Sequence, residues 1–159
     1  MMRRQILPSL LLSGLCISLA AVAAEPQSVA QPASGAMAAA PAPLEVIGSG
    51  TKRHLGHPVQ AAATLDMSAF SGVIAYEPEE LILTAAPSTP LAEIVSVLAT
   101  KNQRLGFDPA DWSQLLGSNG VTTLAGAVSC DASGSGRLRH GGARDSLLGF
   151  HGVNGLGAS

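Results

Sequence analysis

The sequence predicts one small domain of mixed α+β structure over residues 44–159 of a 159-residue chain. Short apolar runs bounded by turn residues predict buried strands. One stretch with apolar residues three and four positions apart predicts an amphipathic helix. The final third is rich in glycine and small residues, which indicates loops and short elements. This alternation of strand, turn and helix favours an α+β or α/β fold and excludes a helical bundle and a coiled coil.

The first 24 residues have the pattern of a secretory signal peptide. Arg3 and Arg4 precede an apolar run from Ile6 to Val22, and small residues lead into Glu25. A basic start, an apolar centre and a small-residue cleavage site are typical of export signals. We therefore expect residues 1–24 to direct Sec-type export to the periplasm. The alternative is an uncleaved N-terminal anchor, through which alone the protein would associate with a membrane.

Residues 25–43 consist mainly of Ala, Pro, Ser and Gln, which predicts a flexible linker. The folded domain is then expected over 44–159, about 115 residues, a usual size for one domain.

Charge and cysteine content exclude several classes of function. Without Arg3 and Arg4 the chain holds seven cations against eleven acidic residues, a net charge of −4. No basic stripe remains, so nucleic acid is not an expected partner. Cys130 is the one cysteine outside the signal segment, and the four histidines lack metal-ligand spacing. We expect no disulfide and no metal site.

The strands are predicted in chain order from residue 44. The runs 44–47, 72–76 and 81–86 are short and apolar, and residues 64–66 form the most strand-like part of an ambiguous stretch. Thr89 is then predicted as the N-cap of a helix, with Pro90 at its first position. Its apolar face is expected to contain Leu91, Ile94, Val95 and Leu98.

The stretch Gly48-Ser49-Gly50-Thr51-Lys52 directly follows the first strand. Glycine permits a sharp turn and close approach to a ligand, and successive backbone N–H groups in such a turn bind phosphate well. The alternative is a plain turn between two elements. From Val121 onward, many small residues likewise suggest close approach of the backbone to a ligand, with a glycine-rich surface loop as the alternative.

Several short motifs occur together in a characteristic order and spacing. They are Gly48–Lys52, Tyr76–Leu81, Thr89–Ile94, Phe107–Pro109, Thr123–Gly126, Ala132–Gly134 and Arg144–Gly149. In this order they resemble the flavin-binding half of the vanillyl-alcohol oxidase / p-cresol methylhydroxylase (PCMH-type) superfamily, and its glycolate oxidase-like members most. The resemblance implies the first α/β lobe of the PCMH-type FAD-binding fold and the start of its second lobe.

The resemblance further implies FAD as the cofactor, held by two groups of residues. Because His54, His57 and His140 do not match the family's covalent flavin-linking histidine, we expect non-covalent binding. The first group would be Gly48, Ser49, Gly50, Thr51 and Lys52, against the pyrophosphate. The second would be Thr123, Leu124, Ala125, Gly126, Ser129, Ala132, Ser133 and Gly134, on the flavin side. Lys52 and Arg53 are candidates to neutralise the diphosphate, the alternative being solvated surface cations.

Three positions depart from the family's pattern. Ser88 and Ala125 stand where glycine is usual, and Asp131 stands where asparagine is common. Each change adds a side chain or a negative charge near the place of a dianionic cofactor, and so bears on its affinity.

The substrate-binding cap of this superfamily has no counterpart in the sequence, so no catalytic residue is assigned. The resemblance implies the FAD-binding portion of an oxidoreductase acting on a 2-hydroxy acid such as glycolate, incomplete alone, with a second chain supplying the cap. The alternatives are a non-catalytic exported α/β module and a truncated remnant. The resemblance would place the protein at the cytoplasmic face of the inner membrane, whereas the signal peptide predicts the periplasm.

Overall fold

The computed structural model describes residues 15–21, 42–156 and 158. Most of the predicted linker and the first 14 residues of the predicted signal peptide lie outside these ranges. The described strands are β1 (Leu15–Ala21), β2 (Leu44–Ile47), β3 (Ala63–Asp66), β4 (Val73–Glu77), β5 (Ile82–Ala85), β6 (Gln103–Leu105) and β7 (Leu147–Phe150). The helices are α2 (Leu91–Ala99), α3 (Leu124–Ser129), α4 (Arg137–His140) and the 3₁₀ turn η1 (Ala143–Ser146).

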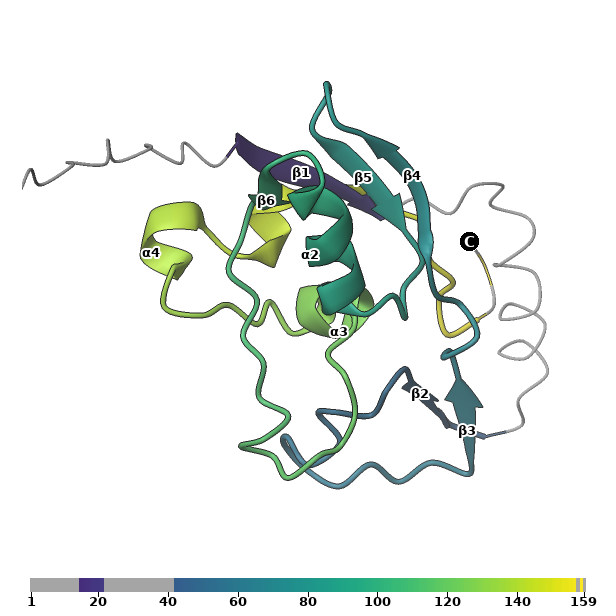
Figure 1. The fold of residues 1–159 in the computed structure, drawn as a ribbon. Coiled ribbons are helices and arrows are strands. Elements are labelled where there is room, and N and C mark those ends of the chain that lie inside the picture. Colours follow the sequence, from purple (N-terminus) through teal and green to yellow (C-terminus); the bar gives the residue numbers. More distant parts are fainter. Residues whose placement is uncertain (1–14, 22–41, 157, 159) are drawn as a thin grey trace, which may run out of the picture.

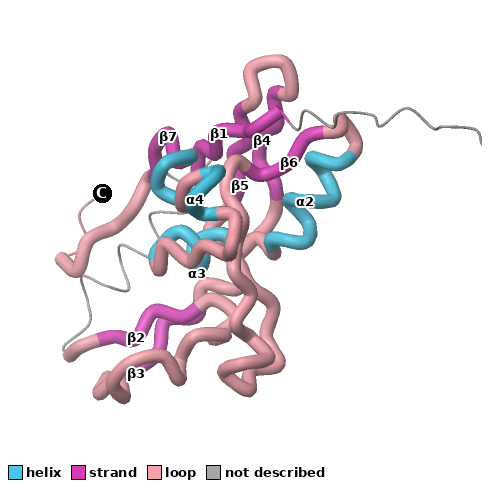
Figure 2. Tube along the Cα trace, turned by 90° about the vertical axis from the view of Figure 1, so that its left-hand side faces the viewer, coloured by secondary structure: helices cyan, strands magenta, loops and turns pink. Residues whose placement is uncertain are grey.

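The strands form two separate sheets. The larger has the order β4-β5-β1-β6, and β7 also pairs with β1. Strands β5, β6 and β7 all run parallel to β1, while β4 and β5 form an antiparallel hairpin. The smaller sheet pairs β2 with β3 in parallel. Helix α3 lies between the two sheets in both Figure 1 and Figure 2.

Strand β1 lies within the segment predicted as a signal peptide. Its backbone pairs with β5 from Ser18 to Ala20 and with β6 from Leu15 to Ile17. Residues 15–21 thus occupy the centre of the larger sheet. Removal of residues 1–24 stays a prediction, and it would take this strand away.

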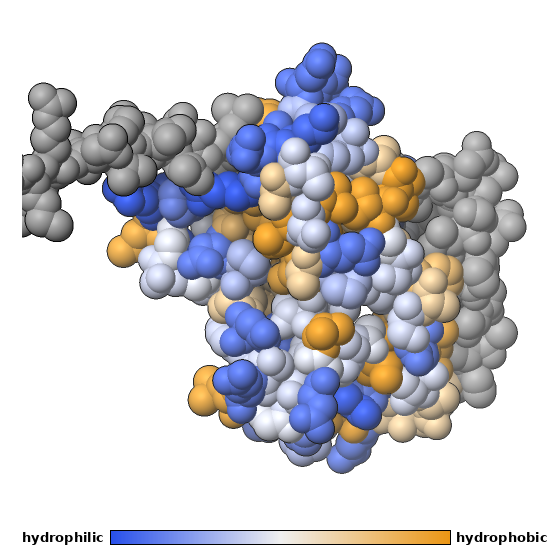
Figure 3. Space-filling model, viewed as in Figure 1, coloured by the Kyte–Doolittle hydropathy of each residue, from blue (hydrophilic) through white to orange (hydrophobic). Residues whose placement is uncertain are grey.

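The core lies between the larger sheet and the helices. Leu83 on β5 and Ile94 and Leu98 on α2 are 0% exposed. Ten buried residues form the cluster: Leu83, Ala85, Leu91, Ile94, Leu98, Leu105, Phe107, Leu124, Ala127 and Ala143. In Figure 3 apolar residues gather just below the hydrophilic tip of the β4–β5 hairpin. None of the helices among the described residues is long and apolar enough to span a lipid bilayer.

Two predictions for α2 are wrong. Helix α2 begins at Leu91 after Pro90, and Thr89 does not cap it. The Thr89 hydroxyl is fully buried, where it accepts from the Gly72 N–H at 2.9 Å and donates to the Ala86 carbonyl at 2.7 Å. Val95, predicted on the buried face, is 49% exposed.

Replacing Thr89 by valine is expected to lower the free energy of unfolding by about 1–3 kcal/mol, the cost of leaving a buried donor without an acceptor. Valine keeps the shape of threonine but offers the Gly72 N–H nothing to bind. Thr100→Val is the matched control, since the Thr100 hydroxyl is exposed and bonds only within its own helix end. Urea unfolding measures both variants, and equal stabilities would contradict the structural role of Thr89.

Candidate functional site

Three loops meet beside α3, beneath it in the view of Figure 1. The first follows β2 and contains residues 48–52, the second joins β5 to α2, and the third leads into α3. The Ser49 hydroxyl donates to the Val121 carbonyl at 2.5 Å, which joins the first loop to the third. The Leu124 N–H donates to the Thr89 carbonyl at 2.9 Å, which joins the third loop to the second. The fold thus brings together the first and third loops, which are more than 70 positions apart in the sequence.

Gly120 allows this close approach, whereas Gly48 has room for a Cβ atom. A Cβ atom on Gly48 would lie 3.5 Å from both the Ser88 and the Thr123 hydroxyl oxygens. A Cβ atom on Gly120 would lie only 2.6 Å from the Ser49 carbonyl oxygen, closer than real Cβ atoms come to backbone. Gly120 therefore sets how closely the first and third loops pack.

The first loop has free hydrogen-bond donors. Within the part of the chain that the structure describes, the backbone N–H groups of residues 48–52 donate to no protein acceptor. Glycine at 48 and 50 adds no side chain to the loop, and Gly50 adopts a φ of 71° that favours glycine. Such a loop offers several donors to a phosphate group.

Lys52 places a positive charge at the same junction. Its ammonium nitrogen lies 3.6 Å from the position that a Cβ on Gly126 would take. Among the described residues the ion pairs are Arg53–Glu45 and Arg137–Asp131, so Lys52 forms none. Arg53, the other candidate for the diphosphate, lies 2.6 Å from Glu45, which already balances its charge.

An acid that the sequence analysis missed supports this junction. Asp111 accepts hydrogen bonds from the Ser113 N–H at 3.0 Å and the Thr122 hydroxyl at 2.9 Å. The bond from Ser113 is the main reason that the pKa of Asp111 lies below its usual range, and the charge of Lys52 adds a smaller lowering. The signal available in the sequence was the Asp-x-Ser spacing, which is typical of a turn closed by the side chain.

The predicted flavin-side group is divided between the two ends of α3. Thr123 to Gly126 lie at its start, beside the first loop. Ser133 and Gly134 lie beyond its end, where Ser133 pairs with Pro109 and the Gly134 N–H donates to the Asp108 carbonyl at 2.7 Å. Ala132 is buried there, and Ser129 is exposed. A dinucleotide can contact both ends only if it runs along this helix.

The departures from the family's pattern have structural partners. The Ser88 hydroxyl is buried and donates to the Met67 carbonyl at 2.7 Å. The Asp131 carboxylate lies 2.7 Å from the Arg137 guanidinium, which is the largest cause of its lowered pKa. The Ala125 N–H donates to the Pro87 carbonyl at 2.9 Å, which helps to join the loops. The added negative charge of Asp131 is therefore balanced within the chain.

Comparison with known proteins identifies the family of this chain. The model of the FAD binding domain family matches residues 20–158. The chain belongs to this family. Glycolate oxidase subunit GlcE of Escherichia coli (strain K12) is 35% identical over 115 residues, which cover 72% of this chain and 31% of that subunit. The chain thus spans about a third of that relative's length. No solved structure matched.

Membership of the FAD binding domain family confirms the predicted cofactor and the resemblance to glycolate oxidase-like proteins. FAD is the cofactor of this domain. The junction of the loops fits its diphosphate: residues 48–52 offer unused N–H donors, and Lys52 offers a charge without an ion-pair partner among the described residues. The assignment of individual residues to the cofactor stays a prediction.

Proposed function

We propose that this chain is the FAD-binding portion of a flavin-dependent oxidoreductase that acts on a 2-hydroxy acid such as glycolate. The observation that carries the proposal is the meeting of the Gly48–Lys52 loop with Thr123 and Gly126 around the Lys52 ammonium. The name of the relative, a glycolate oxidase subunit, supports the substrate class. When bound, the flavin would supply the hydride-accepting chemistry for such a substrate, and the residues of this chain would hold it in place.

In this proposal the residues of the chain bind and orient the cofactor. The N–H groups of residues 48–52 and the Thr123 hydroxyl would bind the phosphate oxygens, and Lys52 would balance their charge. Ala132 to Gly134 are small enough to admit a rigid ring close to the backbone at the other end of α3. The chain would supply the first lobe and the start of the second, and bind the cofactor without a covalent link.

A second chain would complete the enzyme and supply the substrate-side cap. The relative is named as a subunit. Leu148 on β7 is 59% exposed, and Phe150 on the same strand is 71% exposed. Large exposed apolar side chains on a strand are common where another chain packs. This surface supports an association, which the proposal assigns to the partner that carries the cap.

Titration of the full chain with FAD, followed by quenching of flavin fluorescence, tests the proposal. We expect saturable binding of FAD. Gly50→Val should weaken it about tenfold, because valine is strained at positive φ and would distort the first loop, residues 48–52, which we call the phosphate loop. Gly56→Val is the matched control. Gly56 has a φ of 89° and open space around it, so it carries the same backbone cost outside the loop.

The other outcomes separate the alternatives. A folded chain that does not bind FAD at saturating concentration would support a non-catalytic α/β module. An unfolded chain, seen by circular dichroism, would support a remnant. Equal loss of affinity in Gly50→Val and Gly56→Val would show that the phosphate loop is placed elsewhere.

A further inference from the structure

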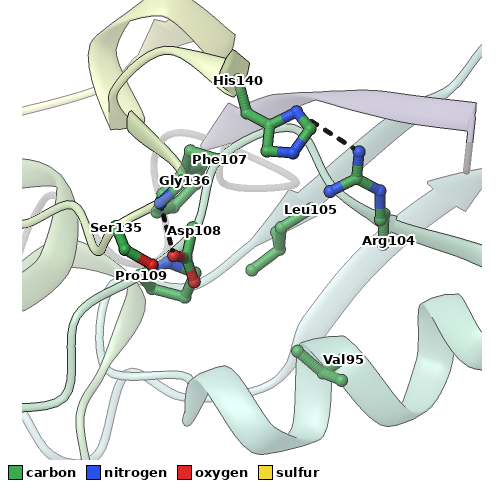
Figure 4. Close-up of a pocket in the computed structure, with 9 residues that line it drawn as sticks. All are labelled: Val95, Arg104, Leu105, Phe107, Asp108, Pro109, Ser135, Gly136 and His140. Carbon is green, nitrogen blue, oxygen red and sulfur yellow. Dashed lines mark hydrogen bonds between the residues drawn. The ribbon is translucent and has the colours of Figure 1, made fainter. Parts of the chain in front are cut away.

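A cavity opens between α2, β6 and α4. Its volume is about 330 Å³, at the lower end of the range of small-molecule sites. Figure 4 shows its lining, which comes from α2, from β6 and the residues that follow it, and from the glycine-rich segment around α4. None of the lining residues belongs to the two groups assigned to FAD, so the cofactor leaves this cavity unused.

The middle of the cavity is apolar and its two ends carry opposite charges. Leu105 and Phe107 are 4% and 2% exposed and belong to the core, so packing fixes their positions. In Figure 4 Arg104 and His140 lie at one end and Asp108 lies at the opposite end. The cavity thus offers a cation, an apolar floor and an anion, in that order.

The cationic end lacks a negative partner within the described part of the chain. Arg104 is exposed, and neither of the ion pairs found among the described residues includes it. Its guanidinium nitrogen lies 3.4 Å from the Nδ1 atom of His140, which can accept a hydrogen bond from it. A guanidinium group has several N–H donors in one plane, so Arg104 keeps donors that match a carboxylate.

The acidic end likewise lacks a positive partner among the residues that the structure describes. The Oδ2 atom of Asp108 accepts from the Gly136 N–H at 3.1 Å, and no described donor bonds to its Oδ1 atom. That oxygen is not one of the buried polar atoms that lack a partner, so solvent or a ligand can reach it. A Cβ atom on Gly134 would collide with Oδ2, so glycine there makes room for the carboxylate. Asp108 therefore presents a fixed carboxylate with one oxygen free to bind.

Two opposite charges that face one cavity without pairing with each other favour a ligand of the reversed polarity. A ligand with a single charge would satisfy one end and leave the other end to water. An α-amino acid carries its ammonium and carboxylate groups on one carbon, so it would contact only one end. An ω-amino acid carries these groups at the two ends of a methylene chain, and such a chain gains free energy from contact with apolar side chains.

We propose that this cavity binds a short ω-amino acid, with its carboxylate on Arg104 beside His140 and its ammonium group on Asp108. The methylene chain lies over Leu105 and Phe107. This site goes beyond the proposed flavin-dependent function, because its residues are not assigned to FAD and binding of the ligand involves no electron transfer.

Isothermal calorimetry of the full chain with δ-aminovalerate, without and with FAD, tests this proposal. We expect saturable binding. Valerate lacks the ammonium group and pentylamine lacks the carboxylate, and each is expected to bind about fivefold more weakly, the upper end of what one exposed ion pair contributes. Glycine, whose two charged groups lie on one carbon, is expected not to bind detectably.

Two variants assign the two ends separately. Arg104→Gln should weaken the binding of both δ-aminovalerate and valerate about fivefold, since both ligands use the carboxylate. Asp108→Asn should weaken only δ-aminovalerate, because asparagine keeps an acceptor for the Gly136 N–H but loses the negative charge. The matched controls are Arg139→Gln and Glu93→Gln, which remove exposed charges of α4 and α2 outside the lining of the cavity.

The ligand comparison and the variants each have an outcome that would overturn the proposal. A wild-type chain that binds valerate as tightly as δ-aminovalerate, or that binds neither, would do so, and so would equal effects of the lining and control variants. The ligand comparison uses the wild type, so it decides the matter even if circular dichroism shows that a variant does not fold. Absence of FAD binding would refute the proposed function and leave this site in place, since its test does not need the cofactor.

Discussion

A Gly120→Val variant is expected to bind FAD about 100-fold more weakly than the wild type while staying folded. The Cβ atom would lie 2.6 Å from the Ser49 carbonyl oxygen and 3.0 Å from a methyl group of Thr51. One neighbour is backbone and the other is a buried side chain, so neither can move alone. The first loop must shift away from the third. Overpacking of this kind costs about 1–3 kcal/mol, and the upper half of that range corresponds to about 100-fold in affinity.

Gly155→Val is the control for this variant. Gly155 has no atom within 4 Å of the position of its Cβ, and it lies outside both loops. Flavin fluorescence titration gives the affinities, and thermal unfolding followed by circular dichroism shows whether each chain is folded. Unchanged FAD affinity in a folded Gly120→Val chain would mean that the cofactor does not use the junction of the two loops.

The strands and the helix that have a local apolar pattern in the sequence were predicted well. The strand at 44–47 agrees with β2, the strand-like part of 61–67 lies within β3, and the runs at 72–76 and 81–86 contain most of β4 and β5. The apolar run at 81–86 reports the burial of β5 directly, whereas β2 and β3 contain no fully buried residue. The apolar spacing after residue 90 likewise predicted α2, because Leu91, Ile94 and Leu98 all pack on the sheet.

Elements that depend on distant partners were missed. Strand β6 has three residues and exists through its pairing with β1, and α4 is a single turn within a glycine-rich stretch. Thr89 was assigned to a cap because its residue type and its place before Pro90 suit one. The structure uses its hydroxyl to satisfy Gly72, 17 residues earlier in the chain. Such pairings leave no local pattern.

The candidate site was predicted in its parts rather than in its arrangement. The glycine loop was predicted from its glycines and its place after a strand, and Thr123 from the resemblance to the PCMH-type superfamily; both assignments stay predictions. The role of Gly120 in packing the loops was missed, because its contacts with Ser49 and Thr51 join segments that are far apart in the sequence. Asp111 and its contact with Thr122 were missed because the Asp-x-Ser spacing indicates a turn but does not predict a partner in another loop.

A chain that begins at Glu25 is expected to lose the cooperative unfolding transition of the full chain. Such a chain lacks β1, which pairs with β5 through Leu19 and Leu83 and with β6 through Ile17 and Leu105. Among the described strands, β6 and β7 have no partner except β1, so the larger sheet would be reduced to the β4–β5 hairpin. A two-stranded hairpin is marginal in water, and the buried Leu83 and Leu105 would lose a neighbouring strand.

Thermal unfolding followed by circular dichroism, compared with a chain that begins at Leu15, isolates the contribution of β1. The Leu15 chain keeps the strand, so it should unfold cooperatively near the melting temperature of the full chain. Cleavage after residue 24 and pairing of Leu15–Ala21 in the sheet exclude one another, since one segment cannot be removed and also hold β5 to β6. A Glu25 chain that melts like the full chain would show that β1 is dispensable and that export with cleavage is compatible with folding. Loss of folding would mean either that the segment stays on the folded protein or that a strand from another chain takes its place.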